Sequence, residues 1–136
     1  THAGMAAGLS GTNANIPLSG INVARTKEVQ EEIVFDLASQ TAELLGVKGG
    51  VAREDIVCYE EYVGPGYSLP TDAMIEAVRL FAAEEAILLD PVYSGKAAAG
   101  LIDLARNGTF AEGANILFLH TGGSPALYAY LETFRN

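Results

Sequence analysis

Side chains that can carry protons stand at three points of the chain where glycine and proline predict loops. They belong to Tyr67, to Tyr93 and Ser94, and to Thr121, which the glycine turn beginning at Gly122 follows. A phenol has a pKa of about 10, so a tyrosine acts as an acid or base near neutrality only when a positive charge lies beside it. The residue types therefore suggest proton transfer at a substrate, with hydroxyls and a glycine turn shaping the site.

The elements that must position these residues repeat one layout, in which a short apolar run leads into a turn with hydroxyl groups and then a helix. The first copy has the run 87–89 and a helix that starts near Ser94, after Asp90-Pro91. The second has the run 116–119 and a helix that starts near Ser124. Continuous apolar runs beside helices predict strands of a parallel sheet covered on both faces.

The turns that follow such strands share one edge of the sheet, where ligands bind in open α/β folds. We therefore expect Tyr93, Ser94, Thr121, Gly122 and Gly123 at that edge. The position of Tyr93 directly before a helix start favours a functional role. Residue type alone favours a packing role for Tyr67, which lies in the loop 63–70.

Hydrophobic patterning places further elements upstream of these turns. Residues 17–23 and 56–59 read as strands, and residues 26–45 as a helix with an apolar stripe that faces a core. The stripe consists of Val29, Ile33, Leu37 and Thr41, with Val34, Ala38 and Leu45 alongside. Thr71 or Asp72 caps another helix. The sequence thus predicts an α/β fold with an open, mostly parallel sheet and helices on both faces.

Composition narrows the class of protein. Seventeen acidic residues against 8 basic ones give a formal net charge of −9, which argues against binding nucleic acid or an anionic membrane surface. No apolar run is long enough to cross a bilayer, and the single cysteine, Cys58, allows no internal disulfide. We therefore expect a cytoplasmic protein, with Cys58 as a buried structural thiol.

Other polar residues carry competing interpretations. The hydroxyl of Thr1, beside small residues at a helix start, suits a bound anion, yet residues alone favour a plain N-cap. His120 could be a base, but a hydrogen-bonded structural histidine is the commoner case. His2 is the only other histidine, and no further ligand stands at metal spacing, so we expect no metal.

Four strings carry a family resemblance in the same order along the chain. They are THAG (1–4), GYSLP (66–70), DPVYSGKAAAGLIDL (90–104) and LFLHTGGSPALYAY (117–130). They resemble the C-terminal part of the pyridoxal-phosphate enzymes related to D-cysteine desulfhydrase and 1-aminocyclopropane-1-carboxylate deaminase, which have the tryptophan synthase β-like fold of type II. The resemblance implies that residues 1–136 are the C-terminal part of a cofactor-binding α/β domain, without the upstream segment that carries the Schiff-base lysine.

The resemblance also implies roles for individual residues. Thr1 would bind the phosphate of pyridoxal 5'-phosphate, and Thr121 would face its pyridine nitrogen with Ser94 and Gly122 beside it. Tyr67 and Tyr93 would be the catalytic residues. Lys96 does not match the cofactor lysine, so the chain alone should be inactive until an upstream segment or second chain supplies that amine.

Two positions distinguish reactions within the resembling enzymes. Deaminases that act on the cyclopropane substrate have an acidic residue where this chain has Ser94, and an aliphatic one where it has Thr121. Both departures favour β-elimination from D-cysteine, which gives pyruvate, ammonia and sulfide. L-cysteate sulfo-lyase and the deaminase remain alternatives, and the non-enzyme alternative is an inactive fragment or half of a split protein. By analogy we expect a homodimer.

Overall fold

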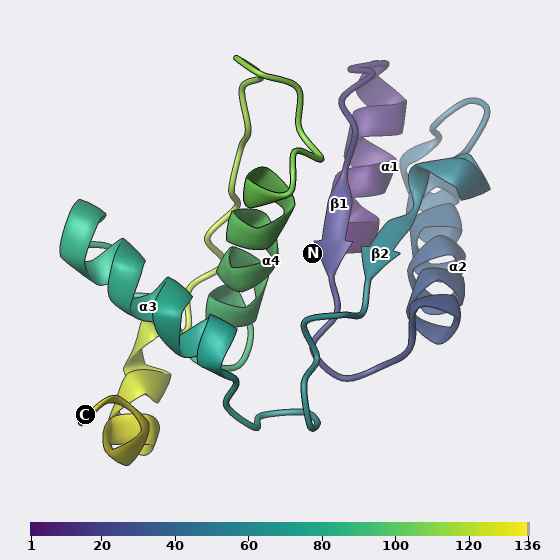
Figure 1. Cartoon of the computed structure of the whole chain (residues 1–136). Helices are drawn as coiled ribbons and strands as arrows, with labels where there is room; N and C mark the ends of the chain where they lie inside the picture. The colour runs from purple at the N-terminus through teal and green to yellow at the C-terminus, as the bar shows by residue number, and fades with distance from the viewer. Residues whose placement is uncertain (136) are drawn as a thin grey trace. The chain divides into compact units, whose positions relative to one another are not determined.

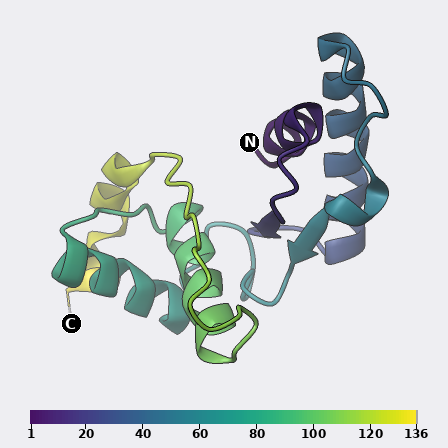
Figure 2. The same ribbon diagram turned by 90° about the horizontal axis from the view of Figure 1, so that it is seen from above.

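The computed structural model describes residues 1–135, which divide into two compact units, Thr1–Glu60 and the residues from Glu61 onward. The first unit contains helices, a short 3-10 turn and two strands: α1 (His2–Thr12), β1 (Ser19–Ile21), α2 (Lys27–Leu45), η1 (Arg53–Asp55) and β2 (Val57–Tyr59) (Figure 1). The strands pair in parallel, with Ser19 opposite Val57. Both views place α1 and α2 on the same face of this pair (Figure 2).

Small side chains explain how α1 and α2 pack together. Ala38 and Ala42 of α2 are fully buried, and with Val34 they form a stripe at helical spacing that faces the alanines of α1. The helix 26–45 is thus confirmed, as is the burial of Val34 and Ala38 in its stripe. The prediction that Val29, Ile33 and Leu37 face the core is wrong, since these side chains are about half exposed. Alanine permits the closer approach of two backbones, and the larger residues turn outward.

Cys58 lies on β2 and is buried, as the sequence predicted. Burial, reinforced by the carboxylate of Glu31, raises the pKa of its thiol to about 11. His2 Nδ1 lies 3.9 Å from the sulfur. A thiol that holds its proton so firmly is a packing group and not a nucleophile.

The second unit contains α3 (Asp72–Glu85), α4 (Ser94–Arg106) and the 3-10 helix η2 (Ser124–Phe134). Thr71 caps α3 as predicted, because its hydroxyl accepts a hydrogen bond from Met74 N at 3.2 Å. Met74, Ala77 and Val78 of α3 share one core with Ala98 and Ala99 of α4. Gly95 permits this contact, since a Cβ there would meet Asp90 O at 2.6 Å and Val78 at 2.9 Å.

Two expectations about the repeated layout need correction. The runs 87–89 and 116–119 form no strand in the described part of the chain, because neither pairs its backbone with a neighbouring strand there. The second helix does begin at Ser124 but follows 3-10 geometry, with a kink at Tyr130. Parallel pairing and the α/β class are confirmed, with β1 and β2 as the only strand pair among residues 1–135.

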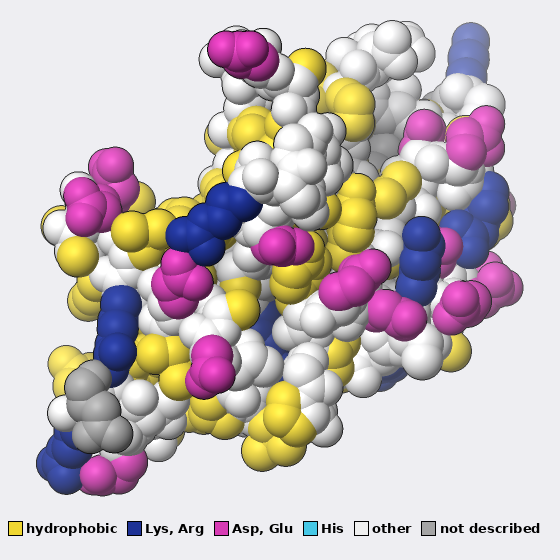
Figure 3. Space-filling view, viewed as in Figure 1, with side chains coloured by type: hydrophobic (Ala, Val, Ile, Leu, Met, Phe, Trp, Pro, Cys, Tyr) yellow, Lys and Arg dark blue, Asp and Glu magenta, His cyan; other side chains and the backbone are white. Residues whose placement is uncertain are grey.

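The surface carries the negative balance seen in the composition. Acidic side chains are scattered over the face shown in Figure 3, with basic ones between them. None of the described helices is both long enough and apolar enough to cross a bilayer.

Candidate active site

The carboxylate of Asp90 organises the turn that presents Tyr93 and Ser94. Its Oδ2 accepts hydrogen bonds from Val92 N at 2.8 Å and Tyr93 N at 2.7 Å. Its Oδ1 accepts from the backbone N and the hydroxyl of Ser94, both at 2.7 Å. Because these donors belong to the start of α4, the buried carboxylate fixes the helix and the residue before it.

The protonation state of Asp90 follows from these hydrogen bonds. Burial alone would raise the pKa of its carboxyl, but the hydrogen bonds from Ser94 and the backbone outweigh burial and lower it. Asp90 is therefore ionised at neutral pH. Its negative charge also lies at the N-terminus of α4, where the helix dipole favours it.

The structure brings Tyr67 and Tyr93 together. Their hydroxyls are hydrogen-bonded to each other, and their rings meet edge to face with centroids 6.0 Å apart. Each ring is about half exposed. The hydrogen bond with Tyr93, followed by partial desolvation, raises the pKa of Tyr67. The hydroxyls of two tyrosines from separate loops thus meet at one solvent-accessible position. The hydroxyl of Tyr67 keeps its proton at neutral pH.

The turn 120–123 lies against the turn that holds Tyr93. His120 accepts a hydrogen bond from Gly122 N at Nδ1, so its Nε2 carries the proton donated to Leu88 O at 3.1 Å. Gly123 has a left-handed φ of 93° and lies so close to Asp90 that an added Cβ would be 3.1 Å from its carboxyl. His120 is therefore hydrogen-bonded and structural, as predicted, and the described residues contain no group of metal ligands.

The remaining predicted site residues differ in their accessibility. Ser94 is buried, and its hydroxyl accepts from Asp90 N at 2.8 Å while donating to the Asp90 carboxylate. Thr121 and Gly122 are exposed on their turn. Thr1 belongs to the first unit, where it occupies the N-cap position of α1. Its side chain is exposed and makes no capping hydrogen bond.

The start of α1 fits a phosphate group. No acidic residue stands in the first turn, and a Cβ added at Gly4 would meet nothing within 4 Å. Free N–H groups, the helix dipole and an uncommitted hydroxyl at Thr1 are the donors that phosphate requires. Thr121 offers a neutral hydroxyl of the kind that can meet a pyridine nitrogen.

Sequence reasoning missed three residues around these loops. Asp90 reads in the sequence only as part of a turn, although an Asp four residues before a helical Ser is a capping signal. Lys96 is buried, and Nζ donates to the carbonyls of Val63 and Gly66. Tyr130 donates its hydroxyl to Ser68 O at 2.9 Å. No local pattern marks the last two, because their partners are distant in sequence.

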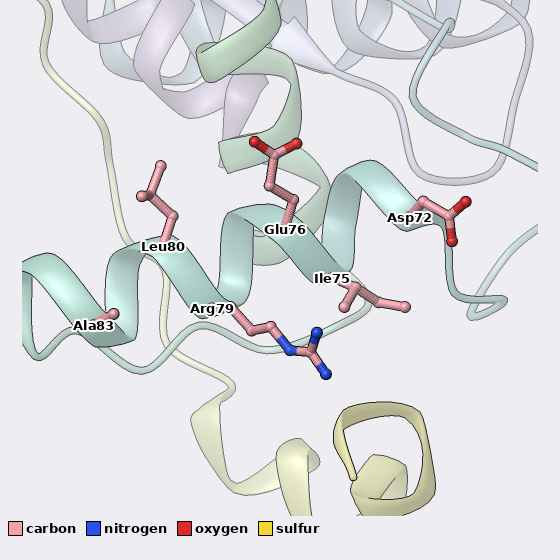
Figure 4. A pocket seen from close by; sticks show the side chains of 6 residues that line it. All are labelled: Asp72, Ile75, Glu76, Arg79, Leu80 and Ala83. Atoms are coloured by element: carbon pink, nitrogen blue, oxygen red, sulfur yellow. The ribbon is translucent and has the colours of Figure 1, made fainter. Parts of the chain in front are cut away.

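Two hollows of the surface lie elsewhere. One open depression of about 560 Å³ follows α3 and is lined by Asp72, Ile75, Glu76, Arg79, Leu80 and Ala83 (Figure 4). Figure 4 shows Ile75 and Arg79 on the side of α3 toward η2, and Arg79 donates to Phe134 O at 3.4 Å. A second, of about 750 Å³, belongs to the first unit. No predicted site residue lines either one.

Known proteins resemble this chain along its length. The family model described as "Pyridoxal-phosphate dependent enzyme" matches residues 1–122. A 1-aminocyclopropane-1-carboxylate deaminase of Burkholderia vietnamiensis is 42% identical over 136 residues, which are 100% of this chain and 40% of that protein. A D-cysteine desulfhydrase of Salmonella paratyphi C is 45% identical over 130 residues, 96% of this chain and 39% of that protein.

A solved structure is similar to this chain in three dimensions. The crystal structure of a homologue of 1-aminocyclopropane-1-carboxylate deaminase superposes with a TM-score of 0.86 at 40% identity. It matches 98% of this chain and 39% of its own. The chain thus spans about 40% of the length of the curated relatives it matches.

Proposed function

The chain belongs to the pyridoxal-phosphate-dependent enzyme family, and from this premise we propose that it is the C-terminal part of a lyase that releases sulfide from D-cysteine. The upstream segment of the same protein, or a second chain, supplies the lysine that binds the cofactor. The complete enzyme is a cytoplasmic homodimer. The observation that carries the proposal is the contact between the hydroxyls of Tyr67 and Tyr93, which come from two different loops.

Hydroxyl and N–H groups hold the cofactor in this proposal. Thr1 and the N–H groups that start α1 bind its phosphate, and the uncommitted hydroxyl of Thr1 supports this role. Thr121 and Gly122 face the pyridine ring, with Ser94 beside them as the residue that Asp90 keeps in place. When bound, pyridoxal phosphate draws electrons from the substrate's α-carbon and so eases the loss of a proton there.

The two phenols act together at the departing sulfur atom. Tyr67 retains its proton, since its pKa is raised, and delivers it from the hydroxyl to the departing sulfur atom. The hydroxyl of Tyr93 is hydrogen-bonded to that of Tyr67 and keeps it in place beside the substrate. The incoming lysine places a positive charge beside the pair, which lets a phenol exchange protons near neutral pH.

The choice of reaction rests on two hydroxyls. A neutral hydroxyl at Thr121 cannot keep a ring nitrogen protonated through charge, whereas a carboxylate can. Ser94 likewise stands where cyclopropane-opening deaminases carry an acidic residue. Both relatives named above have similar identity to this chain, so these two side chains and not the identities favour D-cysteine. L-cysteate is the second candidate substrate.

The test compares three substrates in the complete protein. We expect sulfide from D-cysteine to form faster than sulfite from L-cysteate or a ring-opened keto acid from the cyclopropane substrate. The double variant Ser94→Glu, Thr121→Leu should shift the preference toward ring opening. Because Ser94 is bonded to Asp90, thermal melting of the variant is recorded alongside. A preferred substrate other than D-cysteine, or an unchanged preference in the variant, contradicts the proposal.

The non-enzyme alternative has a separate test. If residues 1–136 are an inactive piece, adding the upstream segment should restore neither cofactor absorbance nor sulfide release. The proposal predicts that both appear on addition. Activity from the 136-residue chain alone would contradict the view that its cofactor lysine lies elsewhere.

A further inference from the structure

We propose that Lys96 is a positioning residue that holds Tyr67 against Tyr93, an inference that rests on the proposed function of these two phenols. Lys96 lies in the first turn of α4 and is fully buried. Its Nζ donates hydrogen bonds to the carbonyl oxygens of Val63 at 2.6 Å and Gly66 at 3.0 Å. Both acceptors belong to the loop that carries Tyr67.

The burial of this ammonium group requires an explanation. A buried lysine loses its hydration and is normally paired with a carboxylate. None of the ion pairs found among residues 1–135 includes Lys96. Burial lowers its pKa, and its hydrogen bonds go to two main-chain carbonyls. Burying Lys96 therefore costs free energy, which is offset only if holding this loop in place contributes to function.

The loop is fixed on both sides of Tyr67. Gly66, the residue before it, is held by Lys96, and Ser68, the residue after it, is held by the hydroxyl of Tyr130 at 2.9 Å. Ser68 has a φ of 65°, in the left-handed region that a serine rarely adopts. Such conformations persist only where surrounding contacts enforce them. The Tyr67 ring is half exposed, so these backbone contacts and not packing set its direction.

The same helix determines the position of the second phenol. Tyr93 is the N-cap residue of α4, three positions before Lys96, and its N–H is bound by Asp90. Lys96 thus connects the loop of Tyr67 to the helix that presents Tyr93. Loss of this connection would release one phenol while the other stays in place.

The test is a double-mutant cycle in the complete, cofactor-loaded enzyme. Lys96→Met removes the donors and keeps the chain length, and Lys48→Met, at an exposed lysine, is the matched control. A misplacement of the order of 1 Å should lower kcat/KM by up to about 100-fold, with cofactor absorbance unchanged. In a Tyr67→Phe background the same change should cause little further loss, because the group that Lys96 positions is already gone. Equal losses in both backgrounds would contradict the inference.

A readout independent of activity separates this inference from the proposed function. Oxidative cross-linking of Tyr67 to Tyr93 as dityrosine, mapped by mass spectrometry, reports whether the phenols still meet. We expect the cross-link in wild type and Lys48→Met and its loss in Lys96→Met. If Lys96→Met does not fold, Lys96→Gln replaces it; its shorter, uncharged side chain keeps one amide donor group, so the cross-link should be reduced and not lost, and a cross-link at the wild-type level overturns the inference. A retained cross-link in Lys96→Met overturns the inference, whereas a lost cross-link in an enzyme without lyase activity supports it and overturns only the proposed function.

Discussion

Replacing Asp90 by asparagine should loosen the start of α4 without changing the size of the side chain. The carboxylate accepts four hydrogen bonds, from the backbone of Val92, Tyr93 and Ser94 and from the Ser94 hydroxyl, at 2.7–2.8 Å. An amide has one oxygen, so its NH₂ group must face one pair of these donors. The Ser94 hydroxyl can turn to accept from that group, but the Ser94 N–H then loses its acceptor.

The magnitude follows from the hydrogen bonds that the amide cannot accept. A hydrogen bond to a charged group contributes about 1.5–3 kcal/mol, and a buried donor without a partner costs about 1–3 kcal/mol. We therefore expect a local loss of about 2–4 kcal/mol, allowing for relaxation of the turn. At about 1.4 kcal/mol for each factor of ten, this corresponds to roughly 30- to 700-fold faster exchange of the protected amides.

Amide hydrogen exchange of the peptide covering residues 88–97 of the complete protein measures this effect directly. Asp72→Asn is the matched control, because Asp72 is an exposed carboxylate in the first turn of α3. Its loss should cost less than about 1 kcal/mol, the usual contribution of a charge near a helix end. Equal protection in wild type and Asp90→Asn would refute the role assigned to this carboxylate.

Three further predictions concern Asp90, Gly95 and Cys58. The pKa of the Asp90 carboxyl is lowered in the folded state, so this group contributes its full stabilisation above pH 3.8, the ordinary pKa of an aspartate. The stabilisation is lost as the pH falls below that value. The difference in unfolding free energy between wild type and Asp90→Asn should therefore shrink at low pH. Gly95→Ala should destabilise by about 1–3 kcal/mol in denaturant unfolding, since its Cβ would overlap Asp90 O. Cys58, with a pKa of about 11, should be alkylated at pH 8 at least about 100-fold more slowly than a free thiol, as mass spectrometry of its peptide can show.

Helices were predictable because their signals are local. The helical period of residues 26–45 and the cap at Thr71 located α2 and α3, and Gly46 ended α2 in the left-handed conformation. The buried face of α2 was only partly predictable in this way, because the apolar stripe contained Val34 and Ala38 together with larger residues such as Ile33. The buried residues of the partner helix α1 are Ala3, Ala6 and Ala7, and close packing against them selects Ala38 over Ile33.

Strands and long-range contacts were less accessible to sequence reasoning. The run 116–119 has the composition of a strand, but a strand exists only where a neighbour pairs with it, and none does within the described residues. The meeting of Tyr67 and Tyr93 was expected from the family resemblance and not from their spacing. The burial of Lys96 depends on a loop about 30 residues away, which no local pattern reveals.

The direct test of the central claim is the behaviour of the two phenols in the complete enzyme. Tyr67→Phe and Tyr93→Phe are each compared with wild type for sulfide release from D-cysteine and for exchange of the substrate's α-hydrogen in deuterium oxide. We predict that each variant keeps its cofactor and releases sulfide about 100-fold or more slowly, the usual contribution of a positioned acid, because Tyr67→Phe removes the proton donor and Tyr93→Phe removes the group that positions it. Wild-type rates of both reactions in both variants would show that the tyrosines are packing residues and would contradict the account.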